Sequence, residues 1–294
     1  MMYFNKVFIS SGFYYTVFRI KNRIILAPCE KLKKAQKYIL NAIKWEYKLK
    51  TDTYNAAQIH TAKKWILKMD IKDFYNSVPY SDIERFIQKV CTKIKNADTN
   101  YYLNLVTVDK KLPTGAPTSA HIANACFKKT EDEIRRLCNI YGVDFSRFMD
   151  DLTFSSNNKK LLQIIEKRVK NILFFYGYKV NSKKTKYISK NKQQKVLGLV
   201  VNNKDACITN EEKRRIRASL HNYVISMAYS TTKDLKHHIW TEKEVSKLTG
   251  KIAYIKNVDY GFYIRLKSYN EKLLKKYKIS FPSFQKIKKP ALLK

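Results

Sequence analysis

The chain contains little glycine and proline, few acidic residues and no long apolar run. Seven glycines and six prolines in 294 residues exclude a collagen-like or linker-dominated architecture. The five cysteines are scattered, with no CxxC pair and no tight group with histidine, which excludes a zinc module and favours reduced thiols. Because no apolar run approaches the roughly 18 to 20 residues of a membrane span, we expect a soluble, cytoplasmic protein without a membrane partner.

Basic residues outnumber acidic residues by more than two to one. The 59 lysines and arginines against 24 aspartates and glutamates give a net charge of +35, in a chain whose 45% hydrophobic content is sufficient for a folded core. Such a charge destabilises a compact chain by self-repulsion unless a polyanion neutralises it. We therefore expect nucleic acid as the partner, with an anionic membrane as the weaker alternative.

Hydrophobic periodicity predicts mixed strands and helices in the first two thirds of the chain and helices in the last third. Thr241 and Glu244 have the spacing of a helix capping box. The predicted elements are a hairpin over 14–28, a helix over 29–48, a strand ending near 70, a helix over 81–95, a helical stripe over 122–141, strands on either side of 150–151, a helix over 159–176, strands over 178–181 and 194–202, and helices beyond 210.

Three aspartates fall at the ends of predicted strands. Asp70 ends one strand, and Asp150 and Asp151 occupy the turn between two others. If these strands are neighbours in one sheet, three carboxylates meet at its edge and require cations there. Carboxylate oxygens suit Mg²⁺, and two such ions about 4 Å apart can activate a hydroxyl and stabilise a leaving pyrophosphate. An Asp-Asp pair alone is also typical of a solvated turn, but the flanking strands favour the metal site.

Several segments resemble the motifs of reverse transcriptases, in the same order as in that family. "FMDD" resembles the Tyr/Phe-x-Asp-Asp box, "MDIKDFY" the first catalytic aspartate motif, and "LPTGAPTS" the Leu-Pro-Gln-Gly-x-Pro-x-Ser motif between them. "YGYKVNSKKTKY", "VLGLVVN" and "LTGKIAYIKNV" are similar to the segments that follow, the second of them to the primer-grip hairpin, and "NRIILAP" with "LKKAQ" is similar to the fingers motif. The resemblance covers roughly residues 15–270.

The resemblance implies an α+β right-hand polymerase fold with fingers, a palm built on an antiparallel sheet with helices, and a helical thumb. Residues 1–66 would form the N-terminal part of the fingers. Residues 67–205 would form the palm, with an inserted fingers segment and the catalytic motifs, ending in the primer grip. Residues 206–294 would form a basic helical thumb and C-terminal RNA-binding region.

The family's catalytic roles transfer to matching positions. Asp70 and Asp150 would hold two Mg²⁺ ions, with Asp151 as a supporting carboxylate and the backbone carbonyl of Ile71 as a further metal ligand. Lys184 matches a lysine proposed to protonate the departing pyrophosphate. Its neighbours Lys183 and Lys186 are alternatives for that register.

Other positions match residues that bind the incoming dNTP. Tyr75 falls at the family's steric gate, which rejects ribonucleotides by clash with the 2′-hydroxyl, and Phe74 is the alternative gate. Gly115 and Pro117 would shape the loop against the incoming base. Arg23 would reach the triphosphate, with Arg19 and Lys21 as weaker candidates.

A further group of residues is predicted to contact nucleic acid or its surroundings. Arg147 would pair with the catalytic aspartates or with a primer phosphate, Leu197 and Gly198 lie in the primer-grip segment, and Lys251 lies in the last matching helix. His60 is equally consistent with two roles: a structural residue that caps a helix or satisfies its hydrogen bonds, or a functional side chain.

Among bacterial members the best resemblance is to retron reverse transcriptases, by length and by the absence of an appended maturase or endonuclease domain. That resemblance implies a primer 2′-hydroxyl in the enzyme's own structured noncoding RNA, dNTP substrates and a branched DNA product (msDNA), with antiphage defence through an effector or toxin protein. The chain departs from the retron pattern at 55–60 and 196–198, and has Thr114 where the family has glutamine. The alternatives are another bacterial defence or diversity-generating reverse transcriptase, or a non-catalytic nucleic-acid binder.

Overall fold

The computed structural model describes residues 3–10, 12–20, 23–46, 52–92, 98–229 and 240–279. The chain divides into two compact units, residues 1–192 and 193–294. Lys21, the end of the helix predicted over 81–95, and the last fifteen positions of the basic tail (280–294) lie outside the described residues.

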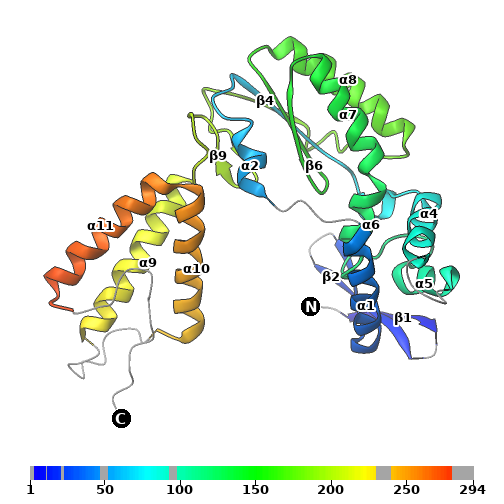
Figure 1. The fold of residues 1–294 in the computed structure, drawn as a ribbon, viewed down its shortest axis with the longest axis horizontal. Helices are drawn as coiled ribbons and strands as arrows, with labels where there is room; N and C mark the ends of the chain where they lie inside the picture. Colours follow the sequence, from blue (N-terminus) through cyan, green and yellow to red (C-terminus); the bar gives the residue numbers. More distant parts are fainter. Residues whose placement is uncertain are drawn as a thin grey trace. The chain divides into compact units, whose positions relative to one another are not determined.

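An antiparallel three-stranded sheet begins the first unit (Figure 1). It contains β1 (Tyr3–Ser10), β2 (Phe13–Ile20) and β3 (Arg23–Pro28), and the β2–β3 pair confirms the predicted hairpin. Helix α1 (Glu30–Glu46) follows and packs on this sheet. Its fully buried Gln36 donates hydrogen bonds to the Tyr15 hydroxyl (2.6 Å) and the Leu105 carbonyl (2.7 Å), which ties the sheet to a later helix.

A four-stranded antiparallel sheet in the order β5-β6-β4-β7 forms the centre of the first unit. The strands are β4 (Trp65–Asp70), β5 (Asp144–Phe148), β6 (Asp151–Ser156) and β7 (Lys186–Ser189). Helices α7 (Lys128–Ile140) and α8 (Lys159–Phe175) pack on one face of this sheet (Figure 1). The mixture of helices and antiparallel sheets confirms the predicted α+β class.

The two faces of the central sheet differ in polarity because side chains alternate along a strand. On the face toward α7 and α8, Leu67, Met69 and Phe154 are almost completely buried, which stabilises the fold by about 1.5–3 kcal/mol for each side chain. The opposite face carries Asp70 and Asp151 at one end. This polar face positions the candidate site.

Shorter helices complete the first unit. They are α2 (Thr53–Gln58), α3 (Phe74–Ser77), α4 (Tyr80–Cys91), α5 (Thr99–Val106) and α6 (Ser119–Cys126). The helical stripe predicted over 122–141 forms two helices, because Phe127 ends α6 and begins α7. Gly142 then adopts a left-handed conformation after α7, as a helix end requires.

The second unit joins a small hairpin to three helices. The hairpin pairs β8 (Lys195–Val196) with β9 (Leu199–Val200), and the helices α9 (Asn210–Tyr229), α10 (Glu242–Val258) and α11 (Tyr260–Lys276) pack against one another (Figure 1). The capping box of Thr241 and Glu244 is confirmed at the start of α10. In the described ranges, no helix has the length and apolarity needed to cross a membrane.

One strand prediction was wrong. Residues 178–181 form only an isolated bridge, Ile71 with Val180, while the fourth strand of the central sheet is β7. The cause is that 178–181 bonds only to the last residue of β4 and to the residues just after it: Asn181 N–H donates to the Asp70 carbonyl, and Lys72 N–H donates to the Lys179 carbonyl. The short, lysine-bearing β7 shows little apolar alternation by which it could be predicted.

Candidate active site

Asp70 and Asp151 face each other across the pair of strands β4 and β6. They are register partners in the antiparallel ladder, and the Ile71 N–H donates to the Asp150 carbonyl (3.0 Å). The structure thus brings the three predicted aspartates together at one end of the two inner strands of the sheet, as their positions at strand ends indicated. Like charges in directly opposite positions destabilise a sheet, so this arrangement has an energetic cost.

The surroundings of the aspartates reflect this crowding of negative charge. Burial raises the pKa of Asp150, and the negative charges of Asp151 and Asp70 raise it further. Asp70 is 8% exposed; it accepts from the Lys184 ammonium (2.8 Å) and from the Asn181 side-chain amide (3.3 Å). Asn181 was not among the predicted site residues, although it stands in the same motif segment as Lys184.

The backbone turn that carries the aspartates is strained. Phe148 pairs with Asp151, so Met149 and Asp150 form a two-residue loop between β5 and β6. Met149 has φ = 54°, a left-handed conformation that costs a residue with a side chain about 1–2 kcal/mol. No feature of the sequence pattern indicated this conformation, because glycine is the usual residue at such a position.

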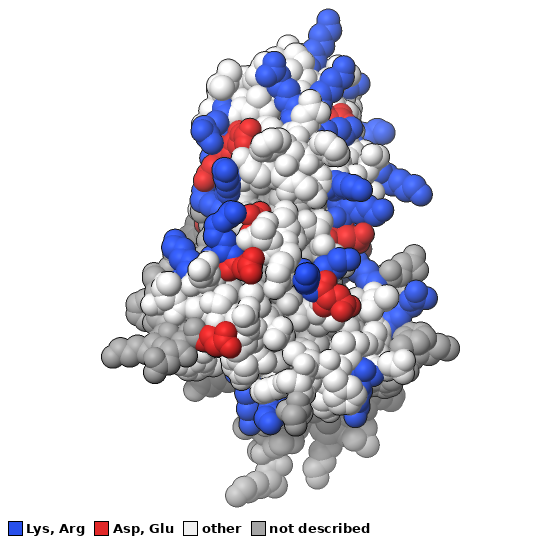
Figure 2. All heavy atoms as spheres, turned by 90° about the vertical axis from the view of Figure 1, so that its right-hand side faces the viewer, with Lys and Arg blue, Asp and Glu red and all other residues white. Residues whose placement is uncertain are grey.

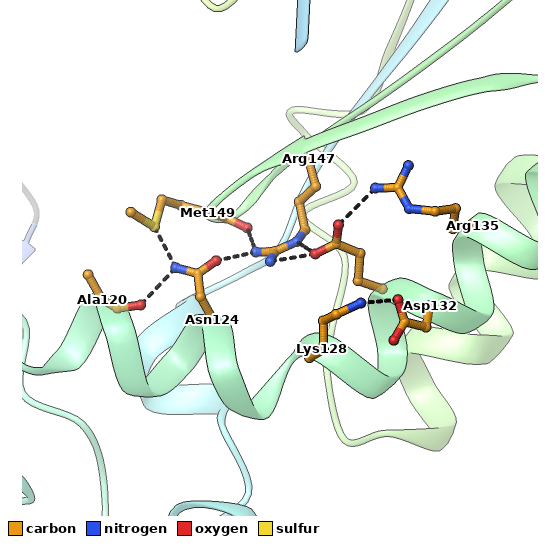
Figure 3. A network of polar contacts seen from close by, with 8 residues as sticks. Ala120, Asn124, Lys128, Asp132, Arg135, Arg147 and Met149 are labelled. Atoms are coloured by element: carbon orange, nitrogen blue, oxygen red, sulfur yellow. Dashed lines mark hydrogen bonds and ion pairs between the residues drawn. The ribbon is translucent and has the colours of Figure 1, made fainter. Parts of the chain in front are cut away.

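The Arg147 side chain points toward helices α6 and α7 and contacts the turn at Met149 (Figure 3). Its guanidinium donates to the Glu131 carboxylate (2.7 and 2.9 Å), to the Asn124 side-chain oxygen (2.7 Å) and to the Met149 carbonyl (2.8 Å). Its side chain is 3% exposed. The pairing with the catalytic aspartates that the sequence suggested is therefore wrong, because the bonds of the guanidinium go to Glu131, Asn124 and Met149.

The two candidates for the steric gate have different surroundings. Phe74 is 5% exposed and packs edge-on against Phe127, with ring centroids 5.6 Å apart, as part of the hydrophobic core. Tyr75 is partly exposed, and its hydroxyl pKa is raised by burial and by the negative charge of Asp150. Tyr75 thus has an exposed part while Phe74 belongs to the core, and this difference favours Tyr75 over Phe74.

The loop at 112–118 touches the first sheet of the unit. Leu26 N–H donates to the Thr114 carbonyl (2.8 Å), and a Cβ added to Gly115 would lie 2.7 Å from the Leu26 carbonyl oxygen. Gly115 also has φ = 123°, a backbone conformation that residues with a side chain rarely adopt. The lack of room for a Cβ and the backbone conformation therefore both require glycine at this position. Pro117 is partly exposed on the same loop, and Arg23 is exposed at the start of β3.

His60 is part of the polar face of the central sheet. It follows α2, is 0% exposed, and its ring nitrogens lie 2.7 Å from the Ser155 hydroxyl and 2.8 Å from the Ser146 hydroxyl. Its pKa is lowered to about 4: burial is the main cause, Asp144 opposes it, and Lys63 and Lys68 add smaller effects in the same direction as burial. The neutral imidazole thus joins α2 to β5 and β6, which is the structural alternative considered for this residue.

The remaining predicted residues belong to the second unit. Leu197 and Gly198 form the two-residue turn between β8 and β9, with φ values of 49° and 87°. Two positive φ angles are typical of the tight turns that suit hairpins. Lys251 on α10 donates to the Glu212 carboxylate of α9 (2.7 Å), so its ammonium is paired within the unit.

On one face of the molecule, charged side chains are unevenly spread. Figure 2 views the side on which α4 and α5 lie in Figure 1: basic side chains project at the top and along the edges, acidic ones lie among them, and uncharged ones occupy much of the middle.

In the part of the chain that the structure describes, no group of three or more His, Cys, Asp or Glu side chains is arranged to hold a metal ion. The two-ion site therefore stays a prediction.

Comparison with known proteins identifies the family. A family model described as "Reverse transcriptase (RNA-dependent DNA polymerase)" matches residues 15–201. The chain is 25% identical over 291 residues to the Retron Ec83 reverse transcriptase of Escherichia coli, covering 90% of each chain. It is 29% identical to the Retron Ec86 reverse transcriptase of the same organism, over 87% of this chain and 78% of that protein. The chain therefore belongs to the reverse transcriptase family, is an RNA-directed DNA polymerase, and is of the bacterial retron type.

Proposed function

We propose that Asp70, Asp150 and Asp151 form the polymerase active site, and that the enzyme copies part of its own structured noncoding RNA into a branched msDNA that starts from an RNA 2′-hydroxyl. The observation that carries the catalytic assignment is the direct pairing of Asp70 with Asp151 inside the segment that matches the family model. These carboxylates repel one another, and a cation bound at the ends of β4 and β6 would compensate their charge.

The donors at this edge fit a divalent metal ion by their chemistry. Asp70, Asp150 and Asp151 provide hard carboxylate oxygens, which divalent ions such as Mg²⁺ prefer. The ion pair between the Lys184 ammonium and the Asp70 carboxylate shows that positive charge is favourable at this position. The bridge between Ile71 and Val180 uses the carbonyls of Asp70 and Lys179, which leaves the Ile71 carbonyl as a candidate additional ligand. When bound, Mg²⁺ would activate the attacking hydroxyl and stabilise the charge on the triphosphate.

The protein's own groups would then position the reactants. Lys184 carries protons on Nζ and can give one to the departing pyrophosphate, a transfer that contributes typically 10²–10⁴-fold in rate. Tyr75 would press against the sugar of the incoming dNTP and exclude a 2′-hydroxyl. Gly115 and Pro117 would border the base, and Arg23 would hold the triphosphate. Most of the remaining acceleration would come from orientation and from fixed charges.

The RNA partner is proposed from the charge and from the relatives. A net charge of +35 suits a lasting grip on a folded RNA, which offers phosphates and 2′-hydroxyls to a basic surface. The relatives named above are retron enzymes. We assign residues 1–66 and the segment inserted in 67–205 to the fingers, the rest of 67–205 to the palm and primer grip with Leu197 and Gly198, and 206–294 with Lys251 to an RNA-binding thumb. Antiphage defence through an effector protein would be the biological role.

The test is to identify the nucleic acid that co-purifies with the wild type and with Asp150→Asn, after separate RNase and DNase treatments. We expect a branched RNA–DNA species on the wild type and bare RNA on the variant, because the amide cannot replace the carboxylate. Asp132→Asn on α7, whose side chain is 43% exposed and pairs with Lys128, is the matched control and should retain the DNA. DNA on Asp150→Asn would remove the catalytic assignment, and RNA without DNA on the wild type would remove the self-primed reaction.

A further inference from the structure

The turn that carries Asp150 and Asp151 is supported from below by a buried polar network. Two groups contact Met149: the Arg147 guanidinium donates to its carbonyl (2.8 Å), and the Asn124 amide nitrogen lies 2.8 Å from its sulfur. The pairing of Phe148 with Asp151 holds the two ends of the turn. Met149 is in a left-handed conformation that it does not favour by itself. The turn therefore depends on its neighbours to hold this shape.

Arg147 is fixed in turn by helices α6 and α7. Glu131 of α7 accepts two of its N–H groups, and Asn124 of α6 accepts another while donating to the Ala120 carbonyl (2.7 Å) (Figure 3). Arg135 binds the other oxygen of Glu131 (2.9 Å). Although burial alone raises the pKa of Glu131, the two arginines outweigh it and lower that pKa, so the carboxylate is held in its charged form.

Helix α6 links this network to the loop against the first sheet. The helix begins at Ser119, whose hydroxyl donates to the Pro113 carbonyl (2.8 Å), and the same loop carries Gly115 against Leu26. One end of α6 thus fixes the loop proposed to border the incoming base, and the other end contacts Met149 through Asn124. The spacing between that loop and the carboxylates is set through one short, buried helix.

We propose that Arg147, with Glu131 and Asn124, is a positioning residue that holds the Met149–Asp150 turn at a fixed place relative to α6. It acts through the Met149 carbonyl and does not touch nucleic acid. This replaces the prediction of a primer-phosphate contact, since the side chain is 3% exposed and already donates to a carboxylate, an amide oxygen and a carbonyl of the protein. The inference rests on the proposed catalytic role of Asp150 and Asp151.

The experiment compares Arg147→Lys with Arg135→Lys as the matched control. Lysine keeps the charge at 147 but cannot bind Glu131, Asn124 and the Met149 carbonyl at once, because it lacks the planar fork of arginine. Arg135 shares Glu131 but its side chain is 42% exposed. Single-nucleotide addition on an RNA template with a DNA primer gives kcat and the dNTP KM, and titration at several salt concentrations gives the Kd of the duplex.

We expect Arg147→Lys to lower kcat by about 10²-fold, the effect of a small misplacement of reacting groups, with an unchanged duplex Kd and salt dependence. Arg135→Lys should stay close to the wild type. A weaker duplex Kd with an unchanged kcat would instead identify a phosphate contact, because lysine keeps the charge but not the paired N–H groups of arginine, and would overturn the proposal. Unchanged kcat and Kd would overturn it as well.

A second variant separates positioning from general loss of structure. Glycine adopts positive φ without support, so Met149→Gly in the Arg147→Lys background should restore part of kcat. An unrestored kcat would mean that the arginine does not act through this turn. If Arg147→Lys does not fold, Glu131→Gln keeps the arginine and an amide acceptor and is assayed in its place.

Asp150→Asn is assayed beside these variants. If it retains synthesis, the proposed catalytic site is wrong, whatever the arginine variants do. If it is inactive while Arg147→Lys is fully active, only the positioning role is wrong.

Discussion

The ammonium of Lys184 lies 2.8 Å from the carboxylate of Asp70, although 114 positions separate them in the chain. The backbone makes this contact possible. Asn181 N–H donates to the Asp70 carbonyl and the Lys184 N–H donates to the Asn181 carbonyl, so a tight turn fixes the lysine over the end of β4. This pairing selects Lys184 from the three neighbouring lysines as the one that reaches the aspartates.

We expect Lys184→Met to lower kcat for nucleotide addition by about 10²-fold or more, because the variant loses the proton donor for pyrophosphate. Lys183→Met is the matched control, since Lys183 is exposed and adjacent in sequence. Single-turnover addition at saturating dNTP measures the chemical step. Equal losses in the two variants would show that general positive charge matters rather than the contact with Asp70.

Tyr75→Ala should relax discrimination against ribonucleotides, because the ring that would exclude the 2′-hydroxyl is removed. Phe74→Ala should instead destabilise the fold by about 3–5 kcal/mol, since Phe74 is a buried core residue. The ratio of kcat/KM for a dNTP and its ribonucleotide, with urea unfolding of both variants, distinguishes them. Relaxed discrimination in Phe74→Ala and not in Tyr75→Ala would transfer the gate to Phe74.

Gly115→Ala should raise the KM for dNTPs and weaken the contact between the loop and the first sheet. The new methyl group would lie 2.7 Å from the Leu26 carbonyl oxygen and 3.1 Å from the Ile25 side chain, so the loop must shift. Gly250→Ala in α10 is the control: its Cβ would meet nothing within 4 Å, and alanine in a helix interior is more stable than glycine by about 1 kcal/mol. An unchanged KM in Gly115→Ala would show that the loop does not border the nucleotide.

The strands around the aspartates could be predicted because their apolar residues are local and periodic, and their ends place Asp70, Asp150 and Asp151 together. The role of Arg147 could not, because its partners Asn124 and Glu131 lie 23 and 16 positions away on helices whose orientation the sequence does not reveal. The break at Phe127 was missed for a related reason. Phe127 is apolar and buried, so it continues the helical stripe although the helix is interrupted there.

His60 provides a test at acidic pH that is independent of catalysis. Its pKa is lowered from 6.5 to about 4 in the folded state, mainly by burial. Above pH 6.5 the ring is neutral in both states and its full contribution to stability is present. Between pH 6.5 and 4 the unfolded chain binds a proton that the folded chain does not, so the free energy of unfolding falls by about 1.4 kcal/mol per pH unit, or about 3 kcal/mol in total.

His60→Gln removes this titration, so its free energy of unfolding should fall less steeply than that of the wild type between pH 6.5 and 4. At pH 7.5 the variant should be less stable, because the bonds to Ser155 and Ser146 are lost or weakened. Urea unfolding at several pH values measures both effects. Ser155→Ala is the control: it loses one partner but keeps the buried ring, so its slope should match the wild type. Parallel curves for wild type and His60→Gln would mean that the ring titrates normally and that α2 is not held to the sheet as described.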